Sequence, residues 1–227
     1  STSSVLNHGL SINDSQTYRL RHINHHTQIF ALLGKPVEKS PGHLFHNAYF
    51  FEKKIAAVYV KITISKNELP IAWQYIKQLD FSGLSITIPN KEVMADLLQS
   101  KNHKAVNTIS CQPIMRYTNT DGKGAICAIK KHQSCFRKKI LILGSGGSAY
   151  GIATALYMEQ CQITIAGRNK SARQTLANAV NGTTINLKES TEICDMIIGT
   201  LPPLVYEEDH TLIDWIDAIT NQETLFF

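Results

Sequence analysis

The sequence feature that most limits the fold is an apolar segment followed at once by a cluster of glycines. Residues 140–143 (ILIL) form an uninterrupted apolar run, which is typical of a strand buried on both faces of a parallel sheet. Residues 144–149 (GSGGSA) follow with the pattern G-x-G-x-x-A, and a helical stretch continues through residues 153–156. A strand, a glycine-rich turn and a helix in this order predict the opening of a nucleotide-binding βαβ fold.

Each small residue in this turn has a physical task in binding a dinucleotide. The first glycine permits the tight turn, the second lets the backbone approach a pyrophosphate, and the third small residue lets helix and strand pack closely. The N-terminus of the helix offers unpaired N–H groups and a partial positive charge to the phosphates. A purely structural glycine-rich turn is the alternative. The candidate cofactor-binding residues of this turn are Gly144, Ser145, Gly146, Gly147, Ser148 and Ala149.

The end of the next predicted strand indicates which dinucleotide is bound. A chain that prefers NAD usually has Asp or Glu there to bind the ribose 2′-hydroxyl. Here residues 163–166 lead into Gly167, Arg168 and Asn169, with no acidic side chain. A guanidinium can bind a 2′-phosphate through two hydrogen bonds. We therefore expect NADP rather than NAD, with Arg168 and Asn169 binding the cofactor; a solvated loop cation is the alternative for Arg168.

Strands and helices alternate along the chain, which predicts an α/β fold. The predicted strands are residues 29–33, 56–64, 83–88, 106–110, 114–118, 140–143, 162–166 and 195–199, and the predicted helices include residues 43–54, 67–79, 91–99, 122–132 and 171–180. We expect two α/β domains. Residues 29–131 form a substrate-binding domain, residues 132–227 form a Rossmann-type dinucleotide-binding domain, and residues 1–28 are a linker.

Composition excludes several other classes of protein. The 227 residues are 43% apolar, which excludes intrinsic disorder and leaves enough apolar side chains for a core. The net charge of +5 favours phosphates and small anions but does not indicate nucleic-acid binding. Five widely spaced cysteines without a CxxC pair suit reduced thiols better than disulfides or a zinc site. From this cysteine pattern we expect a cytoplasmic protein without a metal. No apolar run is long enough to span a membrane.

Four segments before the glycine-rich turn are informative when taken together. They are residues 34–47 (GKPVEKSPGHLFHN), 83–91 (GLSITIPNK), 105–108 (AVNT) and 119–122 (NTDG). Their order and spacing resemble the shikimate dehydrogenase family, whose members use NADP in chorismate and aromatic amino-acid biosynthesis. The resemblance extends over roughly residues 29–205. It implies reversible reduction of 3-dehydroshikimate to shikimate, with the substrate in a cleft between two α/β domains.

The same resemblance implies the roles of individual residues. Reducing a ketone requires hydride delivery to carbon and a proton for the developing alkoxide. Lys91 directly follows a predicted strand and a proline, and the family's Lys–Asp pair implies that Lys91 and Asp121 are catalytic. Read without the family pattern, Lys91 is a solvated lysine and Asp121 is a helix N-cap. The residues implied to bind the substrate are Ser40, Thr87, Lys91, Asn107 and Asp121, and turn or strand-end hydrogen bonds are the alternative for the others.

The sequence departs from the family pattern at both ends of the site. The family's Ser-x-Ser has Ser40 but then Gly42, so its second hydroxyl is missing. Lys39 stands where the family has His, and Lys104 stands where it has Gly. On the adenosine side, Gly167 replaces the family's Asn.

The two ends of the chain imply a larger parent protein. Residues 18–20 (YRL) resemble the end of a type I 3-dehydroquinate dehydratase domain, which implies an upstream dehydratase fused as in plant and chlamydial proteins. Family members continue past the position of Phe227 with several more elements. Two alternatives to the leading function remain. One is an NAD-dependent quinate/shikimate dehydrogenase, against which Arg168 argues, and the other is a catalytically impaired fragment that only binds nucleotide.

Overall fold

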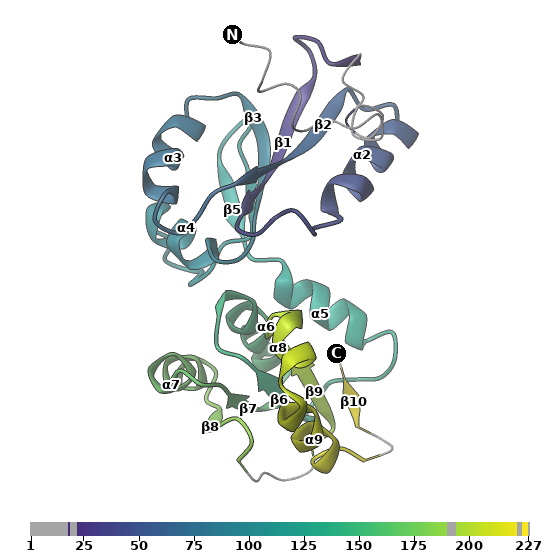
Figure 1. Ribbon diagram of the computed structural model, residues 1–227, viewed down its shortest axis with the longest axis vertical. Coiled ribbons are helices and arrows are strands. Elements are labelled where there is room, and N and C mark those ends of the chain that lie inside the picture. Colours follow the sequence, from purple (N-terminus) through teal and green to yellow (C-terminus); the bar gives the residue numbers. More distant parts are fainter. Residues whose placement is uncertain (1–17, 19–21, 190–193, 222–223, 227) are drawn as a thin grey trace. The chain divides into compact units, whose positions relative to one another are not determined.

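The structure, a computed structural model, describes residues 18, 22–189, 194–221 and 224–226. These residues divide into two compact units (Figure 1). The first unit holds the chain up to residue 102 together with residues 106–118, and the second holds residues 103–105 and 119–227. Each unit is built from helices and one sheet, mixed in the first unit and parallel in the second, which confirms the predicted α/β class.

The first unit has a five-stranded sheet with the strand order β2-β1-β3-β4-β5 in the described residues. Strands β1, β2 and β3 are parallel, β4 is antiparallel to β3, and β5 is antiparallel to β4. The elements are β1 (Gln28–Gly34), α2 (Gly42–Glu52), β2 (Ala57–Thr63), α3 (Leu69–Ile76), β3 (Phe81–Ile86), α4 (Lys91–Leu97), β4 (Thr108–Ser110) and β5 (Arg116–Thr118).

Side-chain alternation along β1 builds a core on each face of this sheet. Ala31 and Leu33 pack with α3 and α4 on one face, whereas Leu32 packs toward α2 on the other. Successive residues of a strand point to opposite faces, so a continuous apolar run is what a sheet covered on both sides requires. The short apolar run read from the sequence at residues 29–33 therefore forms a central strand.

The second unit has a five-stranded sheet with the order β10-β9-β6-β7-β8, and all of its described pairings are parallel. The elements are α5 (Asp121–Ile129), β6 (Lys139–Leu143), α6 (Gly147–Met158), β7 (Gln162–Ala166), α7 (Lys170–Ala179), β8 (Thr183–Ile185), β9 (Met196–Gly199), α8 (Pro203–Glu208), α9 (His210–Ala218) and β10 (Leu225–Phe226).

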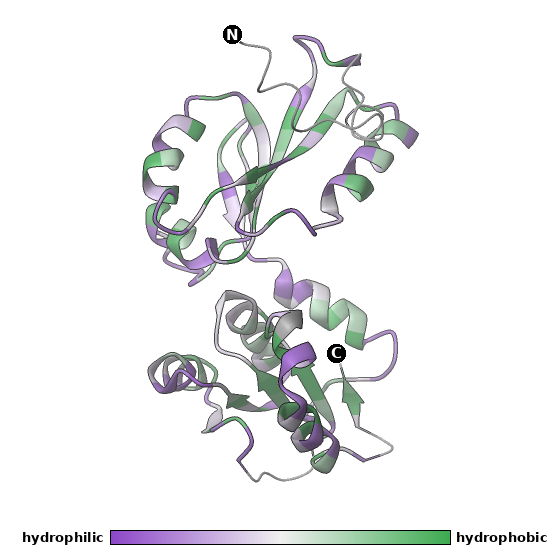
Figure 2. Cartoon of the chain, in the orientation of Figure 1, coloured by the Kyte–Doolittle hydropathy of each residue, from purple (hydrophilic) through white to green (hydrophobic). Residues whose placement is uncertain are grey.

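The central strand β6 is the apolar segment that precedes the glycines. Ile140 and Ile142 pack with α5, α6 and α7 on one face, and Leu141 and Leu143 pack with α9 on the other. All four side chains are at most 1% exposed. Figure 2 shows β6 and its neighbour β9 as strongly hydrophobic, in agreement with a sheet whose centre is covered on both faces.

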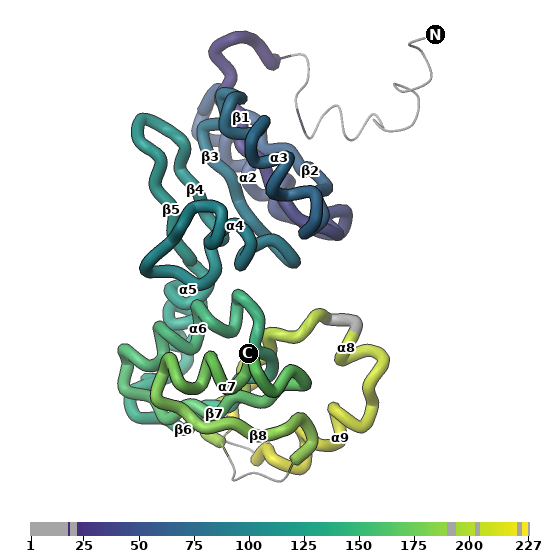
Figure 3. Tube along the Cα trace, turned by 90° about the vertical axis from the view of Figure 1, so that its left-hand side faces the viewer, coloured from purple at the N-terminus to yellow at the C-terminus, as the bar shows by residue number. Residues whose placement is uncertain are grey.

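Helix α5 belongs to the second unit, whereas the sequence analysis placed the domain boundary after it, between residues 131 and 132. The helix packs along α6, as Figures 1 and 3 show. The approach is close because Gly122 faces Gly151 and Ala155, and a Cβ at Gly122 would lie 2.7 Å from the Ala155 Cβ. Periodicity does not show which sheet a helix packs against, so this grouping was not visible in the sequence.

Elements near the C-terminal end were missed by the sequence analysis. They are β8, α8, α9 and β10, which are short or follow a part of the sequence that does not match the family pattern. Of the predicted linker 1–28, only Tyr18 and residues 22–28 lie among the described residues, and Gln28 already begins β1. No helix in the described ranges is long and apolar enough to cross a lipid bilayer.

Candidate functional site

The turn after β6 has the geometry that its glycines predict. Gly144 has a φ of +121°, a backbone conformation that residues with a side chain rarely adopt. A Cβ there would clash with Thr200 Oγ1, which donates to the Leu143 carbonyl at 2.8 Å. The Gly144 N–H donates to the carbonyl of Ala166 at 2.8 Å. The turn is therefore held between the carboxyl ends of β7 and β9.

The N-terminus of α6 is open at the position where phosphates are expected. Gly146 is the N-cap residue and has an extended backbone, and a Cβ built on it would meet no atom within 4 Å. Ala149 is fully buried against β6, which is why a small residue is needed there. Backbone N–H groups at such a helix start bind pyrophosphate well. The N–H donors of this helix start and the open space at Gly146 fit a dinucleotide.

The turn after β7, residues 167–169, carries one exposed cation, Arg168. Gly167 is buried and lies against Ser145, with its virtual Cβ 3.4 Å from Ser145 Oγ. Arg168 is exposed, and within the described residues its guanidinium has no hydrogen-bond or ion-pair partner. Asn169 caps α7, because its Oδ1 accepts from the Ala172 N–H at 3.0 Å. This cap occupies the side-chain oxygen of a residue that the sequence assigned to cofactor binding.

Sheet topology explains why these two turns lie together. Strand β6 sits between β7 and β9 in a parallel sheet, and the chain leaves β6 and β7 at the same edge. In open α/β sheets, ligands bind outside the carboxyl ends of the strands where the strand order reverses. The order β10-β9-β6-β7-β8 places that reversal at β6.

Asn119 joins the start of α5 to the start of α6, and the sequence analysis gave it no role. Its Nδ2 donates to the Ala105 carbonyl at 3.1 Å and to the Gly147 carbonyl at 3.5 Å. Its Oδ1 accepts from the Asp121 N–H at 2.9 Å, and it lies 2.6 Å from the position of a Cβ at Gly151. Asn119 thus fixes the backbone of Asp121 relative to the glycine-rich turn. The only sequence signal was its place in the NTDG segment.

One predicted substrate-binding residue of the first unit lies at the carboxyl end of a parallel strand. Thr87 follows β3, and its N–H donates to the Leu33 carbonyl of β1 at 2.9 Å. Gly34 ends β1 and faces Thr87 so closely that a Cβ at Gly34 would clash with Thr87 Cγ2. The Lys35 N–H donates to the Ile88 carbonyl at 2.9 Å. The ends of β1 and β3 therefore meet at Thr87.

Lys91 is the first residue of α4, and the structure fixes its backbone on both sides. The preceding residue, Asn90, is fully buried, and its Nδ2 donates to the Ile64 carbonyl at 2.8 Å. The carbonyl of Lys91 accepts from the Val106 N–H at 2.9 Å. Lys91 itself is half-buried. Its side chain therefore starts from a backbone anchored to the end of β2 and to the segment before β4.

Asn107 lies at the same edge as Thr87, because β4 runs antiparallel to β3 and begins where β3 ends. Its carbonyl accepts from the Ile86 N–H at 2.8 Å, and its Oδ1 accepts from Thr108 Oγ1 at 2.8 Å. Both Asn107 and Lys91 are half-buried.

Ser40 stands in the turn between β1 and α2. Its Oγ accepts from the Gly42 N–H at 3.4 Å, and its carbonyl lies 3.1 Å from His43 Nδ1. A Cβ at Gly42 would lie 3.5 Å from Ser40 Oγ, which is an ordinary contact. Steric crowding therefore does not require glycine at position 42 in place of the family's second serine. Ser40, Thr87, Lys91 and Asn107 thus all belong to the first unit, and Asp121 belongs to the second.

Comparison with known proteins shows the family of this chain. The model of the shikimate dehydrogenase substrate binding domain matches residues 32–109, and the shikimate / quinate 5-dehydrogenase model matches residues 127–199. The chain is 32% identical over 210 residues to a shikimate dehydrogenase (NADP(+)) of Methanocella arvoryzae, with 87% of this chain and 77% of that protein covered. The chain belongs to the shikimate dehydrogenase family.

Other members of the family are similar over different shares of their length. The shikimate biosynthesis protein AroDE of Chlamydia pneumoniae is 33% identical over 199 residues, which cover 83% of this chain. The chain spans 42% of the length of that relative. A crystal structure of shikimate dehydrogenase from Aquifex aeolicus has a TM-score of 0.80 and 27% identity, and the match covers 90% of this chain and 79% of that one.

A cavity of about 850 Å³ lies at the edge of the second sheet opposite the glycine-rich turn. Its lining includes Lys139, Gln162 and Thr183, which begin β6, β7 and β8. Dinucleotides bind at the carboxyl ends of such strands. In a shikimate dehydrogenase this cavity is therefore separate from the cofactor site.

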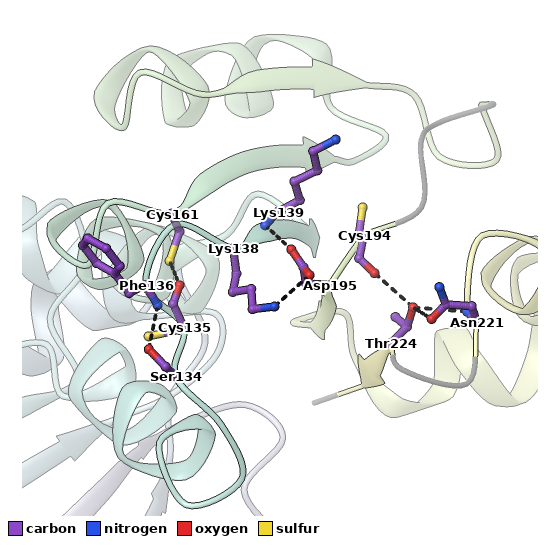
Figure 4. A network of polar contacts seen from close by, with 10 residues as sticks. All are labelled: Ser134, Cys135, Phe136, Lys138, Lys139, Cys161, Cys194, Asp195, Asn221 and Thr224. Atoms are coloured by element: carbon purple, nitrogen blue, oxygen red, sulfur yellow. Dashed lines mark hydrogen bonds and ion pairs between the residues drawn. The ribbon is translucent and has the colours of Figure 1, made fainter.

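Polar contacts at this amino edge tie the strands together (Figure 4). Asp195 accepts from the Lys139 N–H at 2.7 Å and forms an ion pair with Lys138 Nζ at 3.1 Å. Burial opposes ionisation of Asp195, but these hydrogen bonds and the two lysines hold its pKa below the usual value. Asp195 therefore joins the starts of β6 and β9 and is not a candidate acid or base for the reaction.

The buried thiol of Cys161 in the same view has a structural role as well. Its Sγ donates to the Cys135 carbonyl at 2.9 Å. Burial, together with Cys135 and Glu159, raises the pKa of Cys161 to about 12. The thiol thus stays protonated at neutral pH and does not act as a nucleophile.

Proposed function

We propose that this chain carries NADP-dependent shikimate dehydrogenase activity, the reversible reduction of 3-dehydroshikimate to shikimate. The observation that carries the proposal is the joint presence, in one family member, of an open helix start at Gly146 and an exposed Arg168 without an acidic neighbour. Relatives named shikimate dehydrogenase (NADP(+)) and a shikimate dehydrogenase solved in complex with NADP+ support this cofactor. An NAD-dependent activity fits Arg168 less well.

In this proposal, Lys91 and Asp121 act as the acid/base pair. When bound, NADPH supplies the hydride that reduces the carbonyl carbon. The Lys91 ammonium donates a proton to the carbonyl oxygen as negative charge develops there, and it regains a proton from solvent. The Asp121 carboxylate supports the ammonium form of Lys91 and orients it. The anchored backbones of Lys91, through Asn90, and of Asp121, through Asn119, would limit the motion of both groups.

We assign substrate binding to Ser40, Thr87 and Asn107 together with Lys91 and Asp121. Hydroxyl and amide groups both donate and accept, so they suit a small acid that carries several hydroxyls. Thr87 follows β3 and Asn107 precedes the antiparallel β4, so both lie at one edge of the sheet. The backbone of Lys91 is hydrogen-bonded to Val106 near the same edge. Lys39, close to Ser40 in the sequence, supplies positive charge for the substrate carboxylate where the family's second serine is absent.

The assay that tests this proposal is oxidation of shikimate, followed by the absorbance of the reduced cofactor, with NADP+ and NAD+ in parallel. We expect turnover with NADP+ to exceed turnover with NAD+ at equal concentration. Faster turnover with NAD+ would favour the quinate/shikimate alternative. Binding of NADP+ in calorimetry without any turnover would favour a chain that only binds nucleotide.

We also propose that the full protein carries a 3-dehydroquinate dehydratase domain before this chain. The support is the partial coverage of the chlamydial AroDE relatives and the resemblance of residues 18–20 to the end of such a domain. Residues 19 and 20 lie outside the described part of the chain. The mass of the native protein, measured by immunoblot with an antibody to this chain, tests the proposal. A native mass near 25.3 kDa would overturn it.

A further inference from the structure

Arg173 is a buried cation directly below the turn that carries Arg168. It lies in α7 and is only 6% exposed, whereas arginine is almost never buried unless it is paired. Within the described residues it has no acidic partner, and its Nε is buried without a hydrogen bond. Burying a charge in this way is costly unless something near it compensates.

The side chain of Arg173 forms a hydrogen bond to the Gly167–Asn169 turn. Nη1 donates to the Gly167 carbonyl at 2.6 Å, and the backbone N–H donates to the Asn169 carbonyl at 3.0 Å. The Arg173 side chain therefore holds Gly167, the residue before Arg168, whereas the backbone bond to Asn169 belongs to the first turn of α7 and does not depend on the side chain at position 173. Together with the Asn169 cap, these bonds fix the turn against α7 and leave the Arg168 side chain exposed.

We propose that Arg173 is a positioning residue for cofactor choice. It fixes the turn so that Arg168 is presented to the 2′-phosphate, and its buried charge adds positive potential behind that site. The bound phosphate supplies a negative charge, which no acidic side chain in the described part of the chain supplies to Arg173. This inference rests on the proposed NADP dependence and adds a residue to it. A purely structural Arg173 would instead affect every nucleotide equally, through the stability of α7.

The experiment compares two ligands that differ only at the 2′ position, adenosine 2′,5′-bisphosphate and 5′-AMP. Their Kd values are measured by calorimetry on the full chain and on Arg173→Met, with NADP+ and NAD+ as the corresponding pair. Thermal unfolding of each variant is recorded in parallel. Arg137→Met is the matched control, because it removes an exposed arginine of the same unit outside the site.

We expect Arg173→Met to raise the Kd of the two 2′-phosphorylated ligands by about tenfold, the effect of losing one interaction with a charged group. The Kd of AMP and NAD+ should change by less than about twofold, and Arg137→Met should change neither pair. Equal weakening of both pairs, or no weakening, would overturn the inference.

Two further variants keep the test decisive if Arg173→Met does not fold. Arg173→Lys retains the charge and a donor nitrogen, and Arg173→Gln retains a donor nitrogen without the charge. We expect the lysine variant to keep more of the preference for the 2′-phosphate than the glutamine variant, and equal preference in the two would contradict the inference. A wild-type chain without any preference for NADP+ would overturn the proposed cofactor and this inference together. Preference without shikimate turnover would overturn only the proposed activity.

Discussion

Asn90, Asn119 and Arg173 show how single side chains prepare the candidate site without belonging to it. Each uses a polar group to hold a backbone segment next to a candidate residue, respectively Lys91, Asp121 and Arg168. Because hydrogen bonds to buried groups are costly to lose, such residues control geometry more than they add affinity. Their roles depend on contacts between distant segments, so the sequence analysis found the candidate residues and missed these supports.

Arg168→Ala should weaken NADP+ binding selectively. The variant removes the exposed guanidinium proposed to bind the 2′-phosphate, and charge-assisted pairs of this kind are among the stronger hydrogen bonds. We expect the Kd of NADP+ to rise by about 10- to 100-fold and that of NAD+ by less than about threefold. Calorimetry on both cofactors measures this, and an equal rise for the two would show that Arg168 does not bind the 2′-phosphate.

Gly144→Ala should destabilise the second unit. A φ of +121° is strained for alanine, and the added Cβ would clash with Thr200 Oγ1. We expect a loss of about 1–3 kcal/mol in the free energy of unfolding, measured by urea titration. Gly124→Ala is the matched control, since that glycine lies inside α5 with no atom within 4 Å of its virtual Cβ. The control should gain about 0.5–1 kcal/mol, and a similar change in both variants would contradict the account.

At the scale of elements, β2 is an edge strand, and the side-chain amide of Asn47 in α2 binds its outer backbone groups. Asn47 accepts from the Tyr59 N–H at 2.8 Å and donates to the Tyr59 carbonyl at 3.0 Å. Its side chain therefore pairs the outer side of the strand as a neighbouring strand would. An unpaired edge exposes such groups to other chains, so this contact both anchors α2 and covers the edge.

Asn47→Ala should remove this anchor. It leaves the N–H and the carbonyl of Tyr59 without their partner, and both sites are buried. We expect the free energy of unfolding of the first unit to fall by about 1–3 kcal/mol for each buried group left unpaired. Asn102→Ala removes an exposed asparagine of the same unit and should have little effect. Indistinguishable urea midpoints for the two variants would argue against the anchor.

The contacts of Asp195 with Lys138 and Lys139, which join the starts of β6 and β9, should make the free energy of unfolding depend on pH. Because the pKa of Asp195 is depressed in the folded chain, its contribution is present above the unfolded pKa near 3.8 and is lost as pH falls through the folded value. Asp195→Asn should therefore lower the melting temperature at pH 7 and differ less from wild type below about pH 4. Asp217→Asn, at an exposed position of α9, is the control. A difference between wild type and Asp195→Asn that grows toward acid would contradict this account.

At the scale of the whole molecule, the sequence was sufficient for elements with a strong local pattern. The apolar run at 140–143 and the glycines after it predicted β6, its turn and α6 in the right order. The grouping of α5 with the second unit depends on packing at Gly122, which no periodicity records. The short strand β8 and the helices α8 and α9 lack a clear pattern or a family motif, so the sequence analysis did not predict them.

The proposed function depends most on Lys91, and one measurement tests that dependence directly. It is the kcat of shikimate oxidation with NADP+ by the wild-type protein and by Lys91→Ala, with the Kd of NADP+ measured on both. General acid–base catalysis typically supplies about 10²- to 10⁴-fold, so we expect kcat to fall by that factor while the Kd of NADP+ changes by less than about twofold. A Lys91→Ala variant with nearly unchanged kcat would contradict the proposed mechanism.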